Sequence, residues 1–251
     1  MGVMASAQDL PFKSGETLRY SVMFKWGAVN TEVAQAVMKL DSLEYNGAPA
    51  YKTQITARTA PFFDIFYSIR ENFQSWFSID GQRPLKYTRD TDEDGYIATN
   101  LFLYDWDANL IHADIRLGSR EPMILDIPLE EDVYDLASLV FYLRTLDRTT
   151  LRQGDIFPLL LALDDDVFNI QAKCEGYEVL KVRRLGRMKT WHFSFSVVAG
   201  ALFDEGQQLQ VWFADDDNFL PVAIMVPLKM GAVRGWLKSY EGLKYPFDAR
   251  L

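Results

Sequence analysis

The acidic segment 90–97 has the spacing that comes nearest to a metal site. A calcium-binding loop needs oxygen ligands at its first, third and fifth positions, Gly at the sixth and an apolar residue at the eighth. The segment supplies Asp90, Asp92, Asp94, Gly95 and Ile97. The twelfth position should be a bidentate Glu but is Leu101, and the flanking residues alternate as strands do. We therefore interpret the segment as a solvated hairpin tip that turns at Asp94-Gly95, with calcium at the three aspartates as the lesser alternative.

Nucleophilic and zinc chemistry require histidines or cysteines, and both are scarce. The chain has two histidines, His112 and His192, and one cysteine, Cys174. Each histidine lies in the middle of an alternating segment, where we expect a solvent-facing or hydrogen-bonded side chain. Cys174 is expected to be a small buried apolar residue. The sequence contains no Gly-x-Ser-x-Gly elbow and no Gly-rich phosphate loop, so we expect no catalytic residue of these kinds, no metal site and no cofactor.

Carboxylates are the remaining groups that could carry out catalysis. Asp and Glu total 35, and two further acidic runs, 164–166 and 215–217, fall where turns are expected. A glycoside hydrolase would need two carboxyl groups about 5–9 Å apart in a cleft. Sequence spacing does not define such a distance, so a carboxylate-based hydrolase stays as one functional hypothesis.

The apolar segment 60–67 is the most distinctive part of the aromatic content, which comprises 17 Phe, 12 Tyr and 6 Trp. Its sequence, APFFDIFY, does not alternate as a strand would. The segment could fill the core as a short turn, which is the interpretation we favour, or it could line or cover a pocket. If it binds a ligand, the expected contact residues are Phe62, Phe63, Phe66, Phe73 and Trp76.

The overall charge and hydropathy exclude several classes of protein. The chain has 251 residues, a formal net charge of −9 and 49% hydrophobic residues, which is enough for a large core. The negative charge argues against nucleic-acid binding and against electrostatic docking on an anionic membrane. No apolar run approaches the ~18 residues that a membrane-spanning helix needs, so we expect no membrane span.

The first eight residues, MGVMASAQ, have features of a processed leader. Ala5-Ser6-Ala7 has the small-x-small form that precedes a signal-peptidase cut, although a positive region and a full apolar stretch are missing. We expect residues 1–8 to be a residual signal peptide or a leader segment, and the protein to be periplasmic or otherwise exported. No cysteine lies near this point, so anchoring through a lipidated N-terminal cysteine is not expected.

The elements that must position all these residues are mostly strands. Period-two alternation predicts strands near 17–24, 29–40, 51–58, 70–79, 84–91, 95–105, 109–117, 122–128, 156–163, 166–174, 177–184, 189–199, 207–214, 219–227 and 231–240. Turn signals separate them, among them Asp80-Gly81, Glu175-Gly176 and Glu205-Gly206. One segment, 132–147, instead repeats apolar residues at three- and four-residue steps and predicts a helix.

These elements predict an all-β fold of mainly antiparallel strands. About fifteen short strands fit two curved sheets, or an open barrel or sandwich, with one central helix at 132–147. No linker divides the chain, so we expect a single β domain over 9–251. In one alternative, the helix at 132–147 joins two sheet halves.

Three motifs, in this order and spacing, resemble the DUF3108 family, exported bacterial proteins of unassigned function. They are FKSGETLRYSV at 12–22, DLASLVFYLR at 135–144, and VWFADD at 211–216 followed by LPV at 220–222. The resemblance covers about residues 11–245, and the leader looks like those of Bacteroidetes secreted proteins. The resemblance implies export to the periplasm and an antiparallel β architecture. It transfers no catalytic residues, and the shared residues also have structural explanations, which we favour.

Three functional hypotheses follow. The leading one is a non-enzymatic periplasmic protein that binds an apolar or amphipathic ligand, for example a lipid, in a groove of the curved sheet. The second is a cell-envelope interaction module for glycan or protein, which an exposed row of aromatic residues would favour. The third is the hydrolase, which needs two facing carboxyl groups with a raised pKa on one of them. The sequence defines neither the ligand nor the oligomeric state.

Overall fold

A computed structural model of the chain describes residues 9–27, 29–79, 82–197, 208–227 and 231–251. The expected leader at 1–8 and the expected turns at 80–81 and 205–206 lie outside the described residues. Within them the chain forms fifteen strands and one short helix. The strands before the helix are β1 (Glu16–Trp26), β2 (Val29–Tyr45), β3 (Ala48–Thr59), β4 (Ile69–Ser78), β5 (Pro84–Glu93), β6 (Tyr96–Asp105), β7 (Leu110–Leu117), β8 (Met123–Pro128) and β9 (Val133–Tyr134). The elements that follow are α1 (Ser138–Leu143), β10 (Ile156–Leu163), β11 (Asp166–Val182), β12 (Gly186–Val197), β13 (Leu209–Ala214), β14 (Pro221–Pro227) and β15 (Ala232–Glu241).

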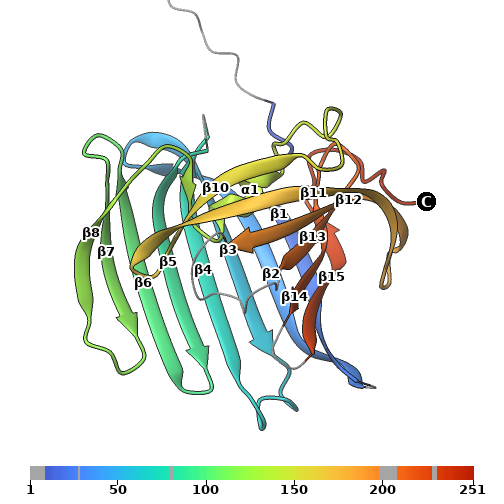
Figure 1. The fold of residues 1–251 in the computed structure, drawn as a ribbon, viewed down its shortest axis with the longest axis horizontal. Coiled ribbons are helices and arrows are strands. Elements are labelled where there is room, and N and C mark those ends of the chain that lie inside the picture. Colours follow the sequence, from blue (N-terminus) through green and yellow to red (C-terminus); the bar gives the residue numbers. More distant parts are fainter. Residues whose placement is uncertain (1–8, 28, 80–81, 198–207, 228–230) are drawn as a thin grey trace, which may run out of the picture.

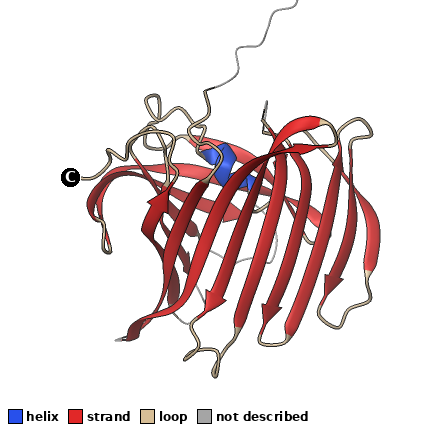
Figure 2. Ribbon diagram, turned by 180° about the vertical axis from the view of Figure 1, so that it is seen from behind, coloured by secondary structure: helices blue, strands red, loops and turns tan. Residues whose placement is uncertain are grey.

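All fifteen strands belong to one sheet, whose two arms start from the pairing of β1 with β15. The order is β8-β7-β6-β5-β4-β3-β2-β1-β15-β14-β13-β12-β11-β10-β9, and every pairing is antiparallel except that of β9 with β10. The sheet curves strongly, so that the β10–β11 arm crosses in front of β4–β6 and α1 lies inside the curve (Figures 1 and 2). The all-β antiparallel prediction is confirmed, in the form of one open, barrel-like sheet.

Alternation along the strands decides which side chains face the interior. In β6, Ala98, Asn100, Phe102 and Tyr104 are buried, whereas the residues between them are more exposed. The buried set packs against the β9–β10 arm through one shared core cluster. Large side chains with no exposed surface fill the space enclosed by the sheet, including Phe77, Phe102, Phe141 and Phe193.

The helix is shorter than the sequence pattern predicts. Only Ser138–Leu143 is helical, and Val133–Tyr134 pairs with Leu160 and Leu161 of β10 as a short strand. The Asp135 carboxylate accepts hydrogen bonds from the backbone N–H groups of Ala137 and Ser138, which fixes a turn before the helix begins. Among the described residues, no helix is long and apolar enough to cross a membrane.

The predicted turn at Glu175-Gly176 is wrong, because β11 runs through it. The register of β11 against β12 shifts between Cys174 and Gly176, so the two residues form a bulge inside one long strand. Gly176 has a φ of 123°, a conformation that a bulge accepts readily when it holds glycine. Pairing with β12 on both sides of the bulge keeps the strand continuous.

Candidate functional site

The connection between β3 and β4 turns tightly and presents apolar side chains to water. Its backbone is closed by hydrogen bonds from Phe63 N–H to the Ala60 carbonyl at 2.8 Å and from Phe66 N–H to the Phe63 carbonyl at 2.9 Å. The exposed fractions are 68% for Phe62, 80% for Ile65, 70% for Phe66 and 48% for Tyr67. We call these four residues the apolar tip. The core-filling turn that we favoured for this segment is therefore wrong.

The base of the apolar tip is held by an ion pair. The Arg70 guanidinium donates to both carboxylate oxygens of Asp64, at 2.9 and 2.5 Å. The Thr59 hydroxyl also donates to Asp64 and accepts a hydrogen bond from Ile69 N–H at 3.1 Å. The hydrogen bonds from Arg70 and then Thr59 lower the pKa of Asp64 to about 2. The tip is thus presented on a turn that is cross-linked across its ends.

The neighbouring β5–β6 hairpin extends this apolar surface. Asp94 N–H donates to the Ser68 carbonyl at 2.7 Å, which joins the hairpin tip to the end of the β3–β4 connection. Tyr96 and Ile97, the first residues of β6, are 46% and 57% exposed. We call the apolar tip together with Tyr96 and Ile97 the rim.

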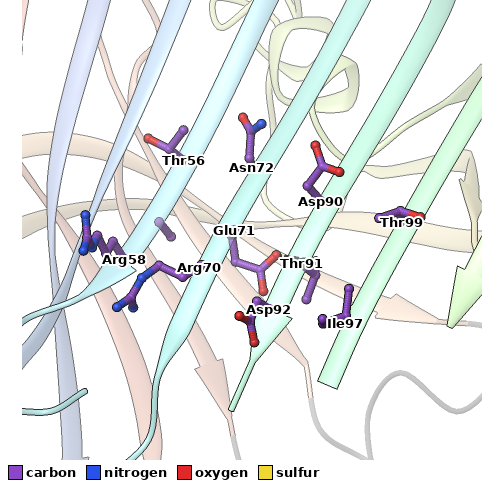
Figure 3. Close-up of a pocket in the computed structure, with 11 residues that line it drawn as sticks. Thr56, Arg58, Arg70, Glu71, Asn72, Asp90, Thr91, Asp92, Ile97 and Thr99 are labelled. Atoms are coloured by element: carbon purple, nitrogen blue, oxygen red, sulfur yellow. Dashed lines mark hydrogen bonds between the residues drawn. The ribbon is translucent and has the colours of Figure 1, made fainter. Parts of the chain in front are cut away.

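Arg70, which holds the base of the apolar tip, also lines a charged hollow of about 440 Å³. Figure 3 shows the residues that line this hollow. Register pairing aligns two rows of side chains across β3–β6. The row nearer the tip consists of Arg58, Arg70, Asp92 and Ile97, and the next consists of Thr56, Asn72, Asp90 and Thr99. Within the described part of the chain Arg58 forms no hydrogen bond or ion pair, and its charge acts only weakly on Asp64. The hollow therefore offers both cationic and anionic groups.

Glu71, on the strand that supplies Arg70, has an unusual protonation state. Its carboxyl accepts a hydrogen bond from the Thr91 hydroxyl at 2.6 Å, and the two side chains meet in Figure 3. Burial raises the pKa of Glu71 to about 7, and the neighbouring Glu93 adds to the rise despite the bond from Thr91. Close to neutral pH this carboxyl is therefore partly protonated, which is the condition set for a carboxylate acid.

A second polar cluster is fully buried, at the start of β1. The Arg144 guanidinium donates to the two carboxylate oxygens of Glu16 at 2.5 and 2.9 Å, and both side chains are at most 1% exposed. Arg144 Nε also donates to the Asn218 carbonyl at 3.1 Å. The rings of Phe12 and Phe141 flank the guanidinium, with centroids 5.2 and 5.3 Å from its carbon. We call these five residues the buried junction.

The buried junction joins the three sequence motifs. Glu16 and Phe12 come from the first, Phe141 and Arg144 from the second, and Asn218 follows the acidic part of the third. Nearby, the Tyr20 hydroxyl donates to the Pro221 carbonyl at 2.8 Å, which joins the first and third motifs again. This arrangement gives the motif residues a structural role, as a brace between distant parts of the sheet.

Comparison with known proteins identifies the family of the chain. The model of the family described as "Protein of unknown function (DUF3108)" matches residues 19–238. The chain belongs to the DUF3108 family. The match confirms the resemblance seen in the sequence and covers strands of both arms of the sheet. No curated protein matches the sequence.

One solved structure shows that the DUF3108 fold extends to very different sequences. It is the crystal structure of a β-barrel-like protein of the domain of unknown function DUF1849 from Brucella abortus. The two chains share 9% identity and superpose with a TM-score of 0.58, over 93% of this chain and all of the other. At this identity the likeness concerns the fold alone.

The structure brings together three of the five expected ligand contacts. The Phe62 ring lies 5.2 Å from that of Phe63 and 5.9 Å from that of Phe66, centroid to centroid. Phe73 instead packs against the interior core cluster. Trp76 lies further along β4, with the ammonium groups of Lys52 and Lys86 at 4.6 and 4.8 Å from its ring. A ligand-binding role for these five residues stays a prediction.

Several residues of the site were missed in the sequence. Ile65 lies inside the segment that was singled out, and its apolar type was the available signal. Arg58, Arg70 and Glu71 gave no such signal, because their proximity depends on the pairing of β3 with β4.

The acidic segment 90–97 forms the expected hairpin tip. Glu93 pairs with Tyr96 across Asp94 and Gly95, both at positive φ, and the Asp92 carboxylate accepts Gly95 N–H at 3.0 Å. Asp90 and Asp92 lie within β5 and not in a calcium loop. In the described ranges, no three His, Cys, Asp or Glu side chains are grouped to hold a metal ion.

The histidines and the cysteine have structural surroundings. His112 is 47% exposed and pairs with Asp126 at 2.7 Å, which raises its pKa. The His192 ring stacks on Trp212 at 4.4 Å between centroids. Cys174 is buried, as the sequence predicts.

Proposed function

We propose that the protein is an exported, non-enzymatic binding protein of the cell envelope that contacts an apolar or amphipathic partner through the rim. The observation that carries the proposal is the apolar tip, which is exposed to water yet cross-linked at its base by Asp64 and Arg70. Soluble proteins seldom keep large contiguous apolar patches exposed unless they meet a partner there. A preformed turn also loses little conformational entropy on binding.

The proposal puts binding at the rim, in place of the groove inside the curved sheet. Phe77, Phe102 and Phe141 have no exposed surface and occupy the interior where such a ligand would lie. The apolar tip is the exposed group of aromatic residues that favours an envelope interaction module. Export rests on the leader pattern at Ala5-Ser6-Ala7 and on the DUF3108 resemblance.

Photo-cross-linking in the cells that produce the protein tests this proposal. A photoreactive phenylalanine analogue is placed at Phe62 or Phe66, and at Ile124 as a control, since Ile124 is 85% exposed on β8. We expect adducts, to protein, glycan or lipid, from the two tip positions and not from Ile124. Equal yields at all three positions, or none at the tip, would overturn the proposal.

A second candidate, the carboxylate-based hydrolase, is favoured by one observation, the raised pKa of Glu71 beside Glu93. Glu71 would act as the acid and Glu93 as the second carboxyl group. The two carboxyl groups are in hydrogen-bonding contact, closer than the ~5–9 Å of a glycoside hydrolase, so the pair would share one proton. The test is hydrolysis of a panel of aryl esters and aryl glycosides by the wild type and by Glu71→Gln. Turnover that Glu71→Gln abolishes would support this candidate, and turnover equal in both proteins would remove it.

A further inference from the structure

We propose that the partner of the rim is the surface of a phospholipid bilayer with zwitterionic headgroups. The apolar tip inserts at the boundary between headgroups and acyl chains, and the charged hollow beside it receives the headgroups. This inference rests on the proposed function, which it narrows to one partner.

The shape and size of the tip favour a bilayer over a folded protein. The β3–β4 connection protrudes beyond the hairpins beside it (Figures 1 and 2). At about 200 Å² for a fully exposed large side chain, the four tip residues offer roughly 500 Å² of apolar surface. A standard protein interface buries about 800 Å² on each partner. Interfacial insertion needs only apolar side chains that reach about 5–10 Å past the headgroups.

Both charges of a zwitterionic headgroup find a counterpart in the hollow. Arg58 is exposed, and it forms no hydrogen bond or ion pair in the described ranges, so its guanidinium is available to a phosphate. Asp90 is exposed and its carboxylate has no hydrogen bond or ion pair within the described ranges, so it is available to an ammonium group. Asp92, in the adjoining row, adds a second negative charge, although one of its oxygens accepts Gly95 N–H. The net charge of −9 and the carboxylates at the rim disfavour an anionic surface. Charge complementarity therefore selects zwitterionic lipid.

The rim contains two tyrosines, the residue type that is common at the boundary between a membrane and water. Tyr67 ends the apolar tip and Tyr96 begins the neighbouring strand, and each ring is about half exposed. Tyrosine is enriched at membrane–water boundaries because its ring is apolar and its hydroxyl remains hydrated. Tyr67 and Tyr96 would lie at headgroup level once Phe62, Ile65 and Phe66 are inserted.

A tryptophan reporter tests insertion directly. Phe66→Trp places a fluorophore in the tip, and Ile124→Trp places one on β8, at a site that is 85% exposed against 70% for Phe66. The six native tryptophans also emit, so the wild-type spectrum recorded under the same conditions is subtracted. With vesicles of phosphatidylcholine and phosphatidylethanolamine, we expect this difference emission of the Phe66→Trp protein to shift to shorter wavelength, and no shift from Ile124→Trp. The shift should persist at high salt, because apolar insertion is not screened. Equal spectra with and without vesicles would overturn the inference.

Vesicle flotation of a tip variant provides the second readout. We expect Phe62→Ser/Ile65→Ser/Phe66→Ser to bind these vesicles at least ten-fold more weakly than wild type, while Ile124→Ser/Tyr177→Ser binds as wild type does. Binding only to vesicles that contain phosphatidylglycerol would contradict the zwitterionic assignment. Circular dichroism and thermal melting of each variant establish that any loss does not come from unfolding.

The outcomes separate this inference from the proposed function. If wild type ignores vesicles but still yields tip-dependent protein or glycan adducts in cells, the bilayer assignment fails and the proposed function stands. A dimer in solution that the tip variant abolishes would likewise overturn the bilayer assignment. If neither vesicles nor cell envelopes contact the tip, both fail.

Discussion

The buried junction and the base of the apolar tip each contain an arginine–carboxylate ion pair, but one pair is buried and the other is partly exposed. At the junction, Arg144 and Glu16 are at most 1% exposed, and the guanidinium is enclosed by two aromatic rings. At the base of the apolar tip, the side chains of Arg70 and Asp64 are 34% and 23% exposed, and the aromatic side chains of the tip face water. The junction has no surface left for a partner, whereas the rim keeps its apolar side chains exposed. The residues of the three sequence motifs thus meet where the fold is braced, and the proposed contact surface lies elsewhere.

The largest effect should come from breaking the junction. Arg144→Met leaves the Glu16 carboxylate buried without its cation, which costs about 3–5 kcal/mol of unfolding free energy. For a chain of this size that corresponds to a fall in Tm of roughly 10 °C. Differential scanning calorimetry measures the change. The matched control is Arg152→Met, because Arg152 is exposed and its side chain forms no ion pair in the described ranges.

A double variant tests whether the buried Glu16 charge causes the loss of stability in Arg144→Met. Glu16→Gln/Arg144→Met removes the stranded charge, so it should recover part of the stability that Arg144→Met loses. If Arg144→Met melts within 2 °C of wild type, in line with roughly 0.5–1 kcal/mol, the junction is not the brace that its geometry indicates.

Breaking the Asp64–Arg70 ion pair should loosen the apolar tip without unfolding the rest of the protein. Asp64→Asn removes the charge that Arg70 holds, so the tip should open more often while Tm changes little. Chymotrypsin cleaves after aromatic residues, and nicking after Phe62, Phe66 or Tyr67 should become several-fold faster. Asp107→Asn, at the turn after β6, is the control. Equal nicking of wild type and Asp64→Asn would show that the tip is held by other contacts.

The pH dependence of the Asp64–Arg70 ion pair follows from the lowered pKa of Asp64. The pKa of Asp64 is lowered to about 2, so the ion pair is present above the ordinary range near 4 and is lost only as the pH falls through about 2. Nicking rates of the native protein, corrected for protease activity, should therefore stay constant from pH 8 to pH 5. A rise in nicking already at pH 5 would contradict this assignment.

A smaller effect is expected from the Glu71 carboxyl, which has no cationic partner at hydrogen-bonding distance in the described part of the chain, unlike Glu16 at the junction. Glu71 has a raised pKa of about 7, so between pH 4.5 and 7 the folded protein holds a proton that the unfolded chain has released. The free energy of unfolding is therefore higher while Glu71 is protonated, at low pH, and falls as the pH rises through 7. Glu71→Gln should gain Tm relative to wild type at pH 8 but not at pH 5. Parallel Tm curves would show that Glu71 titrates normally.

The smallest effect on stability is expected from the tip itself. Phe62→Ser/Ile65→Ser/Phe66→Ser changes side chains that are already 68–80% exposed, so Tm should stay within about 2 °C of wild type. Such a result, beside the loss from Arg144→Met, would separate a brace from a contact surface. A large fall in Tm would mean that the tip packs more tightly than its exposure indicates.

Sequence patterns predicted the strands because the two faces of this sheet differ in burial. The alternation in β6, from Ala98 to Tyr104, is visible as period two, and Asp94-Gly95 is a recognisable two-residue turn. Glu175-Gly176 is likewise an acidic residue followed by glycine, yet it forms a bulge because β12 pairs on both sides of it. Local composition alone does not separate these two outcomes.

The candidate site was only partly predictable, for a related reason. The segment 60–67 was visibly apolar, but its exposure depends on the Asp64–Arg70 cross-link and on the way β3 and β4 end. Glu16 and Arg144 are 128 residues apart in the chain, so their pairing follows only from the closure of the sheet. Both residues stand in segments that resemble the DUF3108 family, and the sequence left their roles open.

Hydrogen–deuterium exchange of the native protein, with and without membranes from the envelope of the cells that produce it, tests the central claim most directly. The account predicts slower backbone exchange at 60–68 and 94–97 in the presence of the membranes, and no change around Glu16, Arg144 and Asn218. Protection around the buried junction instead, or no protection at 60–68, would contradict the assignment of the rim as the binding surface.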